Sequence, residues 1–142
     1  MSATVRPQPP DPASGKVRMT LEQFLAWEET QERRHEFVDG FVRAMTGTTV
    51  RHNAIAGNVY SVLRTAARGT GCRAHISDVQ VRTPSGRTYY PDVLVLCGPF
   101  APSDRYARSP CIIVEVTSPS TRSIDLGEKL DEYRTIPPLR AY

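Results

Sequence analysis

Two stretches of the sequence decide the fold: YPDVLVLC at residues 90–97 and CIIVEVTSPST at residues 111–121. Each contains a short, unbroken apolar run, which is typical of a β-strand that is covered on both faces. One carboxylate flanks each run, because Asp92 precedes the first run and Glu115 follows the second. We therefore expect two buried strands, each with an acidic side chain at its end.

The segments around these runs predict an α/β fold, with a mixed β-sheet flanked by helices. Thr20 and Gln23 form a capping-box pattern, which starts a first helix that extends to about Thr30. Asp39-Gly40 lies between apolar pairs and is typical of a type I′ hairpin turn. The other predicted elements are a helix over residues 49–68, a strand over residues 75–83 and a helix over residues 124–133.

Length and composition indicate one soluble domain. The chain has 142 residues, of which 39% are hydrophobic and 23% are charged, and both values are ordinary for globular proteins. No apolar run approaches the ~18 residues of a membrane-spanning helix, and the N-terminus lacks the apolar core of a secretory signal. We expect a cytoplasmic protein with no membrane contact, a disordered proline-rich tail at residues 1–18 and a domain at residues 19–142.

Cysteine usage argues against a sulfur-based framework. The chain has three cysteines, Cys72, Cys97 and Cys111, and no C-x-x-C pair. An odd count without this spacing makes both a disulfide framework and a thiolate zinc site unexpected. The sequence predicts small buried thiols instead.

Charge permits a polyanionic partner such as DNA without requiring one. The formal net charge is +3, which is a modest excess for nucleic-acid binding. Nearly all basic residues are arginine, and the two lysines are Lys16 in the predicted tail and Lys129 in the domain. Because the chain otherwise uses arginine, Lys129 is a candidate functional residue.

The two strand carboxylates point to a metal ion. Ionised carboxylates within a sheet are costly unless a cation compensates them, and two on neighbouring strands also repel each other. A divalent ion removes both costs, and Mg²⁺ typically binds one or two carboxylates together with water and phosphate oxygens. The alternative is that Asp92 and Glu115 each pair with an arginine.

Several motifs, taken together, resemble a known family. They are HEFVDG at residues 35–40, His52, YPDV at residues 90–93, VEVTSPST at residues 114–121 and DLGEKL at residues 125–130. In order and spacing they resemble the Uma-two family of the PD-(D/E)XK nuclease superfamily, over residues 19–142. The resemblance implies a restriction endonuclease-like fold and a metal-dependent endonuclease that acts on DNA.

The resemblance also implies roles for individual residues. Asp92 and Glu115 would bind Mg²⁺, with Mn²⁺ as a substitute, and the backbone carbonyl of Val116 would be a third ligand. The superfamily places a lysine two residues after the glutamate, but Thr117 stands there in this chain. Lys129 on the following helix would then supply the catalytic cation. The alternative for Lys129 is a solvated lysine beside acidic neighbours.

Three further residues match the family or the site with less specificity. Glu36 would bind the metal directly or through water, or else be an exposed charge of the hairpin. His52 would contact phosphate or transfer a proton, or else cap its helix. Gln80 would line the site, whereas Asp125 suits the first turn of the last helix as a structural residue.

The chain ends earlier than the family pattern, so we expect a domain that is short at its C-terminus. Two functions follow. The first is an active Mg²⁺-dependent endonuclease, with a homodimer left open. The second is a catalytically inactive remnant that acts as a DNA- or protein-binding module. The presence of Asp92, Glu115 and Lys129 favours the first.

Overall fold

The structure is a computed structural model that describes residues 11–142. The described residues divide into two compact units, residues 11–45 and residues 46–142. In the first unit, α1 (Leu21–Glu28) begins at the predicted capping box. Thr20 Oγ1 accepts a hydrogen bond from Gln23 N at 3.2 Å, and Gln23 Oε1 accepts one from Thr20 N at 2.9 Å. These two bonds satisfy backbone donors that an uncapped helix would leave unpaired.

The predicted hairpin follows α1. Strands β1 (His35–Val38) and β2 (Phe41–Ala44) are antiparallel, and the turn residues Asp39 and Gly40 have φ angles of 51° and 91°. Positive φ at both turn positions is the requirement of a type I′ turn. Phe37 of β1 stacks on Phe24 of α1 with ring centroids 4.9 Å apart, so one small apolar core joins helix and hairpin.

The predicted disordered tail lies partly outside the described residues, which begin at residue 11. Within its remainder, η1 (Pro12–Ser14) is a 3₁₀-helix. Arg18 makes an isolated antiparallel bridge to Phe41. The backbone of the first unit is therefore hydrogen-bonded from before α1.

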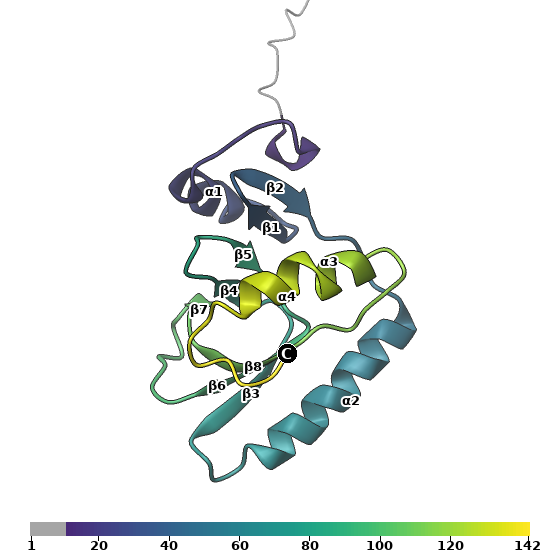
Figure 1. The fold of residues 1–142 in the computed structure, drawn as a ribbon, viewed down its shortest axis with the longest axis vertical. Helices are drawn as coiled ribbons and strands as arrows, with labels where there is room; N and C mark the ends of the chain where they lie inside the picture. Colours follow the sequence, from purple (N-terminus) through teal and green to yellow (C-terminus); the bar gives the residue numbers. More distant parts are fainter. Residues whose placement is uncertain (1–10) are drawn as a thin grey trace, which may run out of the picture. The chain divides into compact units, whose positions relative to one another are not determined.

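In the second unit, β3 (Cys72–Ile76), β6 (Val93–Cys97) and β8 (Pro110–Val114) form an antiparallel sheet with β6 in the middle. Val93 and Leu94 of β6 are fully buried, as their apolar runs predict. Helix α2 (Val50–Ala66) runs beside β3 (Figure 1). The bounds of α2 agree with the predicted helix over residues 49–68.

The predicted strand over residues 75–83 is interrupted. Its first part belongs to β3 and its second part is β4 (Gln80–Arg82), because Ser77 and Asp78 adopt positive φ angles of 53° and 54° and turn the chain. Strand β4 pairs antiparallel with β5 (Thr88–Tyr89) and parallel with β7 (Tyr106–Ala107). The unit therefore combines parallel and antiparallel pairing, and the expected mixed α/β class is confirmed.

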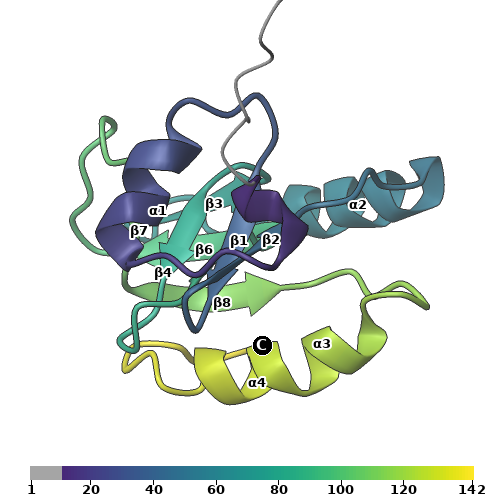
Figure 2. The ribbon, with the colours of Figure 1, turned by 90° about the horizontal axis from the view of Figure 1, so that it is seen from above.

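The last predicted helix, residues 124–133, consists of two helices, α3 (Arg122–Leu126) and α4 (Glu128–Tyr133), which follow β8 (Figure 2). Gly127 separates them with φ −117° and ψ −94°, which lies outside the helical region. A Cβ atom at this position would lie 2.8 Å from the carbonyl oxygen of Ser123. Glycine is therefore the residue that allows α3 and α4 to follow each other so closely.

The expectation of no disulfide is wrong. Cys72 and Cys97 are joined by a disulfide, and they are directly opposite each other in the pairing of β3 with β6. Directly opposed residues share one face of a sheet, and only the strand register, which a cysteine count does not contain, reveals this. Cys111 is a free cysteine and is not fully buried.

After α4, the chain returns to the sheet. Ala141 forms a parallel bridge to Ile112 of β8, and Arg140 N donates to Cys111 O at 2.8 Å. The last residues of the chain therefore pair with β8. Among residues 11–142, no helix is both long and apolar enough to cross a membrane.

Candidate active site

Asp92 and Glu115 are neighbours at one end of the strand pair β6–β8. Val93, the first residue of β6, pairs with Val114, the last residue of β8. Asp92 and Glu115 are the next residues outward, so they continue this register. Asp92 Oδ2 also accepts a hydrogen bond from the backbone N–H of Val116 at 2.7 Å, which holds the two segments together. The antiparallel pairing thus brings both predicted carboxylates to one place.

Both carboxyl groups ionise with difficulty in this position. Burial raises the pKa of Asp92, although the Val116 N–H and the nearby His52 and Lys129 oppose the shift. Burial raises the pKa of Glu115 to about 7, and the charge of Asp92 contributes in the same direction. The side chain of Glu115 is only 7% exposed. The site therefore favours any added positive charge that would allow both groups to ionise.

Lys129 supplies part of this charge. Its Nζ donates to Glu115 Oε1 at 3.0 Å and lies 3.6 Å from Asp125 Oδ1. The lysine side chain is 9% exposed, so Lys129 is not the solvated helix lysine of the alternative interpretation. Among the described residues, neither Asp92 nor Glu115 pairs with an arginine, and the arginine alternative is wrong for both.

Two participants were missed by sequence reasoning. The fully buried Tyr133 donates its hydroxyl to Glu115 Oε1 at 3.0 Å. Asp125 is buried beside Lys129 in addition to lying in the first turn of α3. The available signal was spacing, because Asp125, Lys129 and Tyr133 are four residues apart and four-residue steps lie on one face of a helix.

A second group of contacts fixes α4 against the β4–β5 hairpin. Glu132 Oε1 accepts hydrogen bonds from Thr83 Oγ1 at 2.5 Å and from Ser85 Oγ. Glu132 Oε2 lies 3.3 Å from Arg87 Nη1. Because these residues hold the helix that carries Lys129, they position the lysine without touching the carboxylates.

His52 approaches the site from the first turn of α2. Its Nε2 lies 3.4 Å from Asp92 Oδ2, while its backbone N–H donates to the N-cap side chain Thr49 Oγ1 at 3.1 Å. The cap of the helix is thus Thr49, and the imidazole of His52 is directed to Asp92. The structure brings His52 together with Asp92, Glu115 and Lys129.

The other two predicted residues have partners of their own. Glu36 lies in the first unit, where Arg43 Nε and Nη2 donate to its Oε2 at 2.9 and 2.6 Å. Glu36 is 6% exposed, so it is not an exposed hairpin charge, and its metal role remains a prediction. Gln80 is also buried, and its side-chain amide donates to Tyr90 OH at 2.9 Å.

The donor chemistry of the site fits Mg²⁺. Asp92 and Glu115 offer two carboxylates, the number that Mg²⁺ typically takes from a protein when phosphate and water complete its octahedron. A divalent ion would also favour the ionised form of both carboxyl groups, whose pKa values burial raises. Among residues 11–142, no group of three His, Cys, Asp or Glu ligand atoms that lie within 4.8 Å of one another includes Asp92 or Glu115. The backbone carbonyl of Val116 stays a prediction as the third ligand.

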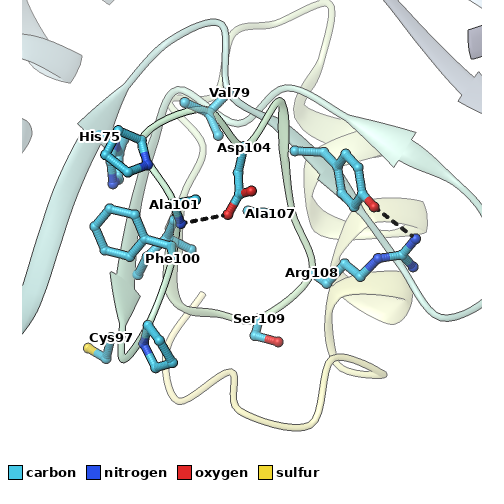
Figure 3. Close-up of a pocket in the computed structure, with 13 residues that line it drawn as sticks. His75, Val79, Cys97, Phe100, Ala101, Asp104, Ala107, Arg108 and Ser109 are labelled. Carbon is cyan, nitrogen blue, oxygen red and sulfur yellow. Dashed lines mark hydrogen bonds between the residues drawn. The ribbon is translucent and has the colours of Figure 1, made fainter.

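A separate cavity of about 500 Å³ lies elsewhere in the second unit, and none of the predicted site residues line it. Figure 3 shows His75, Phe100 and Asp104 around it, with Ala101 N donating to Asp104 Oδ2 at 2.8 Å. The carboxylate site therefore lies outside this cavity.

The fold and the site together define a protein of the restriction endonuclease-like class. A crystal structure from Anabaena variabilis, described as "a putative nuclease belonging to DUF820", superimposes with a TM-score of 0.68 at 18% sequence identity. The match covers 82% of this chain and 69% of that chain. At this identity the likeness concerns the fold.

The chain belongs to the Uma2 family, whose description is "Putative restriction endonuclease", and residues 21–142 match it. The expected family is thereby confirmed. An "Uncharacterized protein slr1290" of Synechocystis is 33% identical over 133 residues, covering 92% of this chain and 70% of the relative. A second Synechocystis relative, "Uncharacterized protein sll1609", is 29% identical over 128 residues, covering 87% and 72%.

Proposed function

We propose that this protein is a Mg²⁺-dependent endonuclease that hydrolyses phosphodiester bonds in DNA. The observation that carries the proposal is the meeting of Asp92, Glu115 and Lys129 at one end of β6 and β8. A half-buried aspartate and a buried glutamate, with a buried ammonium group, suit phosphodiester hydrolysis, which needs a metal ligand set and a cation for developing charge. The family description and the nuclease neighbour support the same reaction class.

Each residue of the site has a distinct task in this proposal. Asp92, Glu115 and the Val116 carbonyl would hold the ion. When bound, the ion would polarise the scissile phosphate and lower the pKa of the attacking water. Lys129 contacts Glu115 now and would turn part of its charge to the phosphate oxygens as the phosphorus becomes pentavalent.

His52 and Tyr133 act on the two carboxylates. His52 lies 3.4 Å from Asp92 Oδ2 and would steady that carboxylate or exchange a proton with it. Tyr133 donates to Glu115 Oε1, which leaves the second oxygen of Glu115 available as a ligand. Thr117, which follows β8, occupies the position of the superfamily's lysine, and Lys129 would deliver the ammonium group from α4 instead.

Cleavage of supercoiled plasmid DNA by the purified chain tests the proposal, with Mg²⁺, with Mn²⁺ and with EDTA. We expect nicking or linearisation that requires the ion and that the Asp92→Ala/Glu115→Ala double variant loses. Asp131→Ala is the matched control, because Asp131 lies on α4 with a side chain that is 79% exposed. No cleavage by a protein with an intact circular dichroism spectrum would favour the inactive binding module.

A further inference from the structure

Three sulfur atoms gather on the sheet of the second unit, away from the carboxylates. Cys72, Cys97 and Cys111 come from the adjacent strands β3, β6 and β8. Their sulfur atoms all lie within 4.8 Å of one another, and Cys97 Sγ is 2.9 Å from Cys111 Sγ. Cys97 ends β6 whereas Asp92 precedes it, so roughly 16 Å of strand separate the two sites at about 3.3 Å per residue.

An irregularity in β8 produces this convergence. Val95 pairs with Ile112, and regular pairing would then place Cys111 opposite Leu96. The register shifts at this point, so that Leu96 pairs with Pro110 and Cys111 becomes the extra residue of a bulge. Opposed residues share a face and successive residues alternate, so regular pairing would point Cys111 away from the face of Cys97. Bulges re-aim side chains in this way next to functional sites.

A disulfide does not account for the whole cluster. The bond between Cys72 and Cys97 uses two sulfur atoms, and Cys111 remains a free cysteine beside them. A metal ion that prefers thiolates takes all three, because three sulfur atoms that share an ion at about 2.3 Å lie within about 4.6 Å of one another. The cluster is also reachable, since Cys97 is exposed and the other two are half-buried.

We propose that Cys72, Cys97 and Cys111 in their reduced form bind one thiophilic metal ion of the Zn²⁺ or Cu(I) type. Soft thiolate ligands select such ions over Mg²⁺, which prefers oxygen. No fourth His, Cys, Asp or Glu of residues 11–142 joins the group. Zn²⁺ therefore completes its four-coordinate shell with water or an external ligand, whereas Cu(I) is satisfied by the three sulfur atoms.

Binding requires a reductant, which we name as a phosphine. The phosphine and one water molecule convert the Cys72–Cys97 disulfide to two thiols and the phosphine to its oxide. The disulfide is thereby reduced by two electrons, which the phosphine supplies. The three thiols then release three protons as they bind the ion, because the thiolate is the metal ligand. The sulfur of Cys97 points away from the neighbouring cavity (Figure 3), so the ion would lie outside that cavity.

Cd²⁺ titration of the full chain tests the proposal, because Cd²⁺ bound to thiolates absorbs in the ultraviolet. The chain is reduced with the phosphine and desalted without oxygen before titration. We expect absorbance that saturates at one ion per chain, and a weaker apparent affinity for Cd²⁺ when Zn²⁺ or Cu(I) competes for the thiolates. Displacement by each ion in turn distinguishes the two candidate metals.

Variants decide which residues hold the ion. Cys111→Ser and Cys111→Ala should each weaken Cd²⁺ binding by about tenfold or more, because loss of a ligand costs at least as much as loss of its supporting contacts. The Asp92→Asn/Glu115→Gln double variant should bind Cd²⁺ with unchanged thiolate absorbance. Equal binding by the Cys111 variants and the original chain, or loss of binding in the double carboxylate variant, would overturn the proposal. Circular dichroism verifies that each variant is folded.

Discussion

Replacing Glu115 with glutamine should remove a pH dependence of stability that this one carboxyl group creates. The folded protein holds the Glu115 proton more tightly than the unfolded chain does, because burial raises the pKa from 4.5 to about 7. The associated stabilisation is complete below the unfolded pKa and is lost as the pH rises through the folded pKa. Metal-free protein should therefore become less stable between about pH 5 and about pH 8.

The magnitude follows from the two pKa values. The difference between 4.5 and about 7 corresponds to about 3 kcal/mol of unfolding free energy, most of which is lost between about pH 5 and about pH 8. Glutamine resembles the protonated acid and does not titrate. The unfolding free energy of Glu115→Gln should thus increase relative to that of the original chain as the pH rises. At about pH 8 the variant should be more stable by about 2–3 kcal/mol.

Urea unfolding in EDTA measures this difference at both pH values, since the free energy extrapolates linearly to water. Glu22→Gln is the matched control, because Glu22 is exposed on α1 and should leave the pH dependence unchanged. The reasoning fails if the original chain and Glu115→Gln lose the same free energy between the two pH values. Mg²⁺ added at the higher pH should stabilise the original chain more than the variant.

The remaining predictions concern α4 and two glycines. Lys129→Met should abolish plasmid cleavage. It should also lower the unfolding free energy, measured with urea at about pH 8, by about 3 kcal/mol, because Glu115 loses its buried cation. A similar loss in acid would contradict this cause. Gly127→Ala should lower the unfolding free energy by about 1–3 kcal/mol, since the added Cβ would lie 2.8 Å from Ser123 O. An unchanged melting temperature would refute this prediction. Gly57→Ala should instead stabilise α2 by about 1 kcal/mol, because nothing lies within 4 Å of the added Cβ.

Elements that depend on local chemistry could be predicted from the sequence. Thr20 and Gln23 cap α1 as expected, and the Asp39-Gly40 turn follows directly from the conformations that Asp-Gly allows. The break at Gly127 could not be predicted in the same way. A lone glycine within a helical pattern is often tolerated, and only the backbone path of α3 and α4 excludes a side chain there.

The candidate site, too, could be predicted only in part. Carboxylates at the ends of two apolar runs identified Asp92 and Glu115, and rarity of lysine drew attention to Lys129. The contact of Tyr133 with Glu115 and the disulfide of Cys72 with Cys97 depend on which distant segments pack together. Hydrophobic pattern and composition contain no record of that packing, so these features required the structure.

The site is divided between a sheet, which holds the carboxylates, and the six-residue helix α4, which holds Lys129. A segment this short opens locally far more easily than the whole domain unfolds. When α4 detaches, Glu115 gains water, which favours its ionisation more than the loss of the ammonium group opposes it, because burial is the largest cause of its raised pKa. The openings that let the amide protons of α4 exchange with solvent should therefore be more frequent in alkaline than in acid buffer, after correction for the intrinsic effect of pH on exchange. The lifetime of the assembled site thus depends on the proton of the Glu115 carboxyl group.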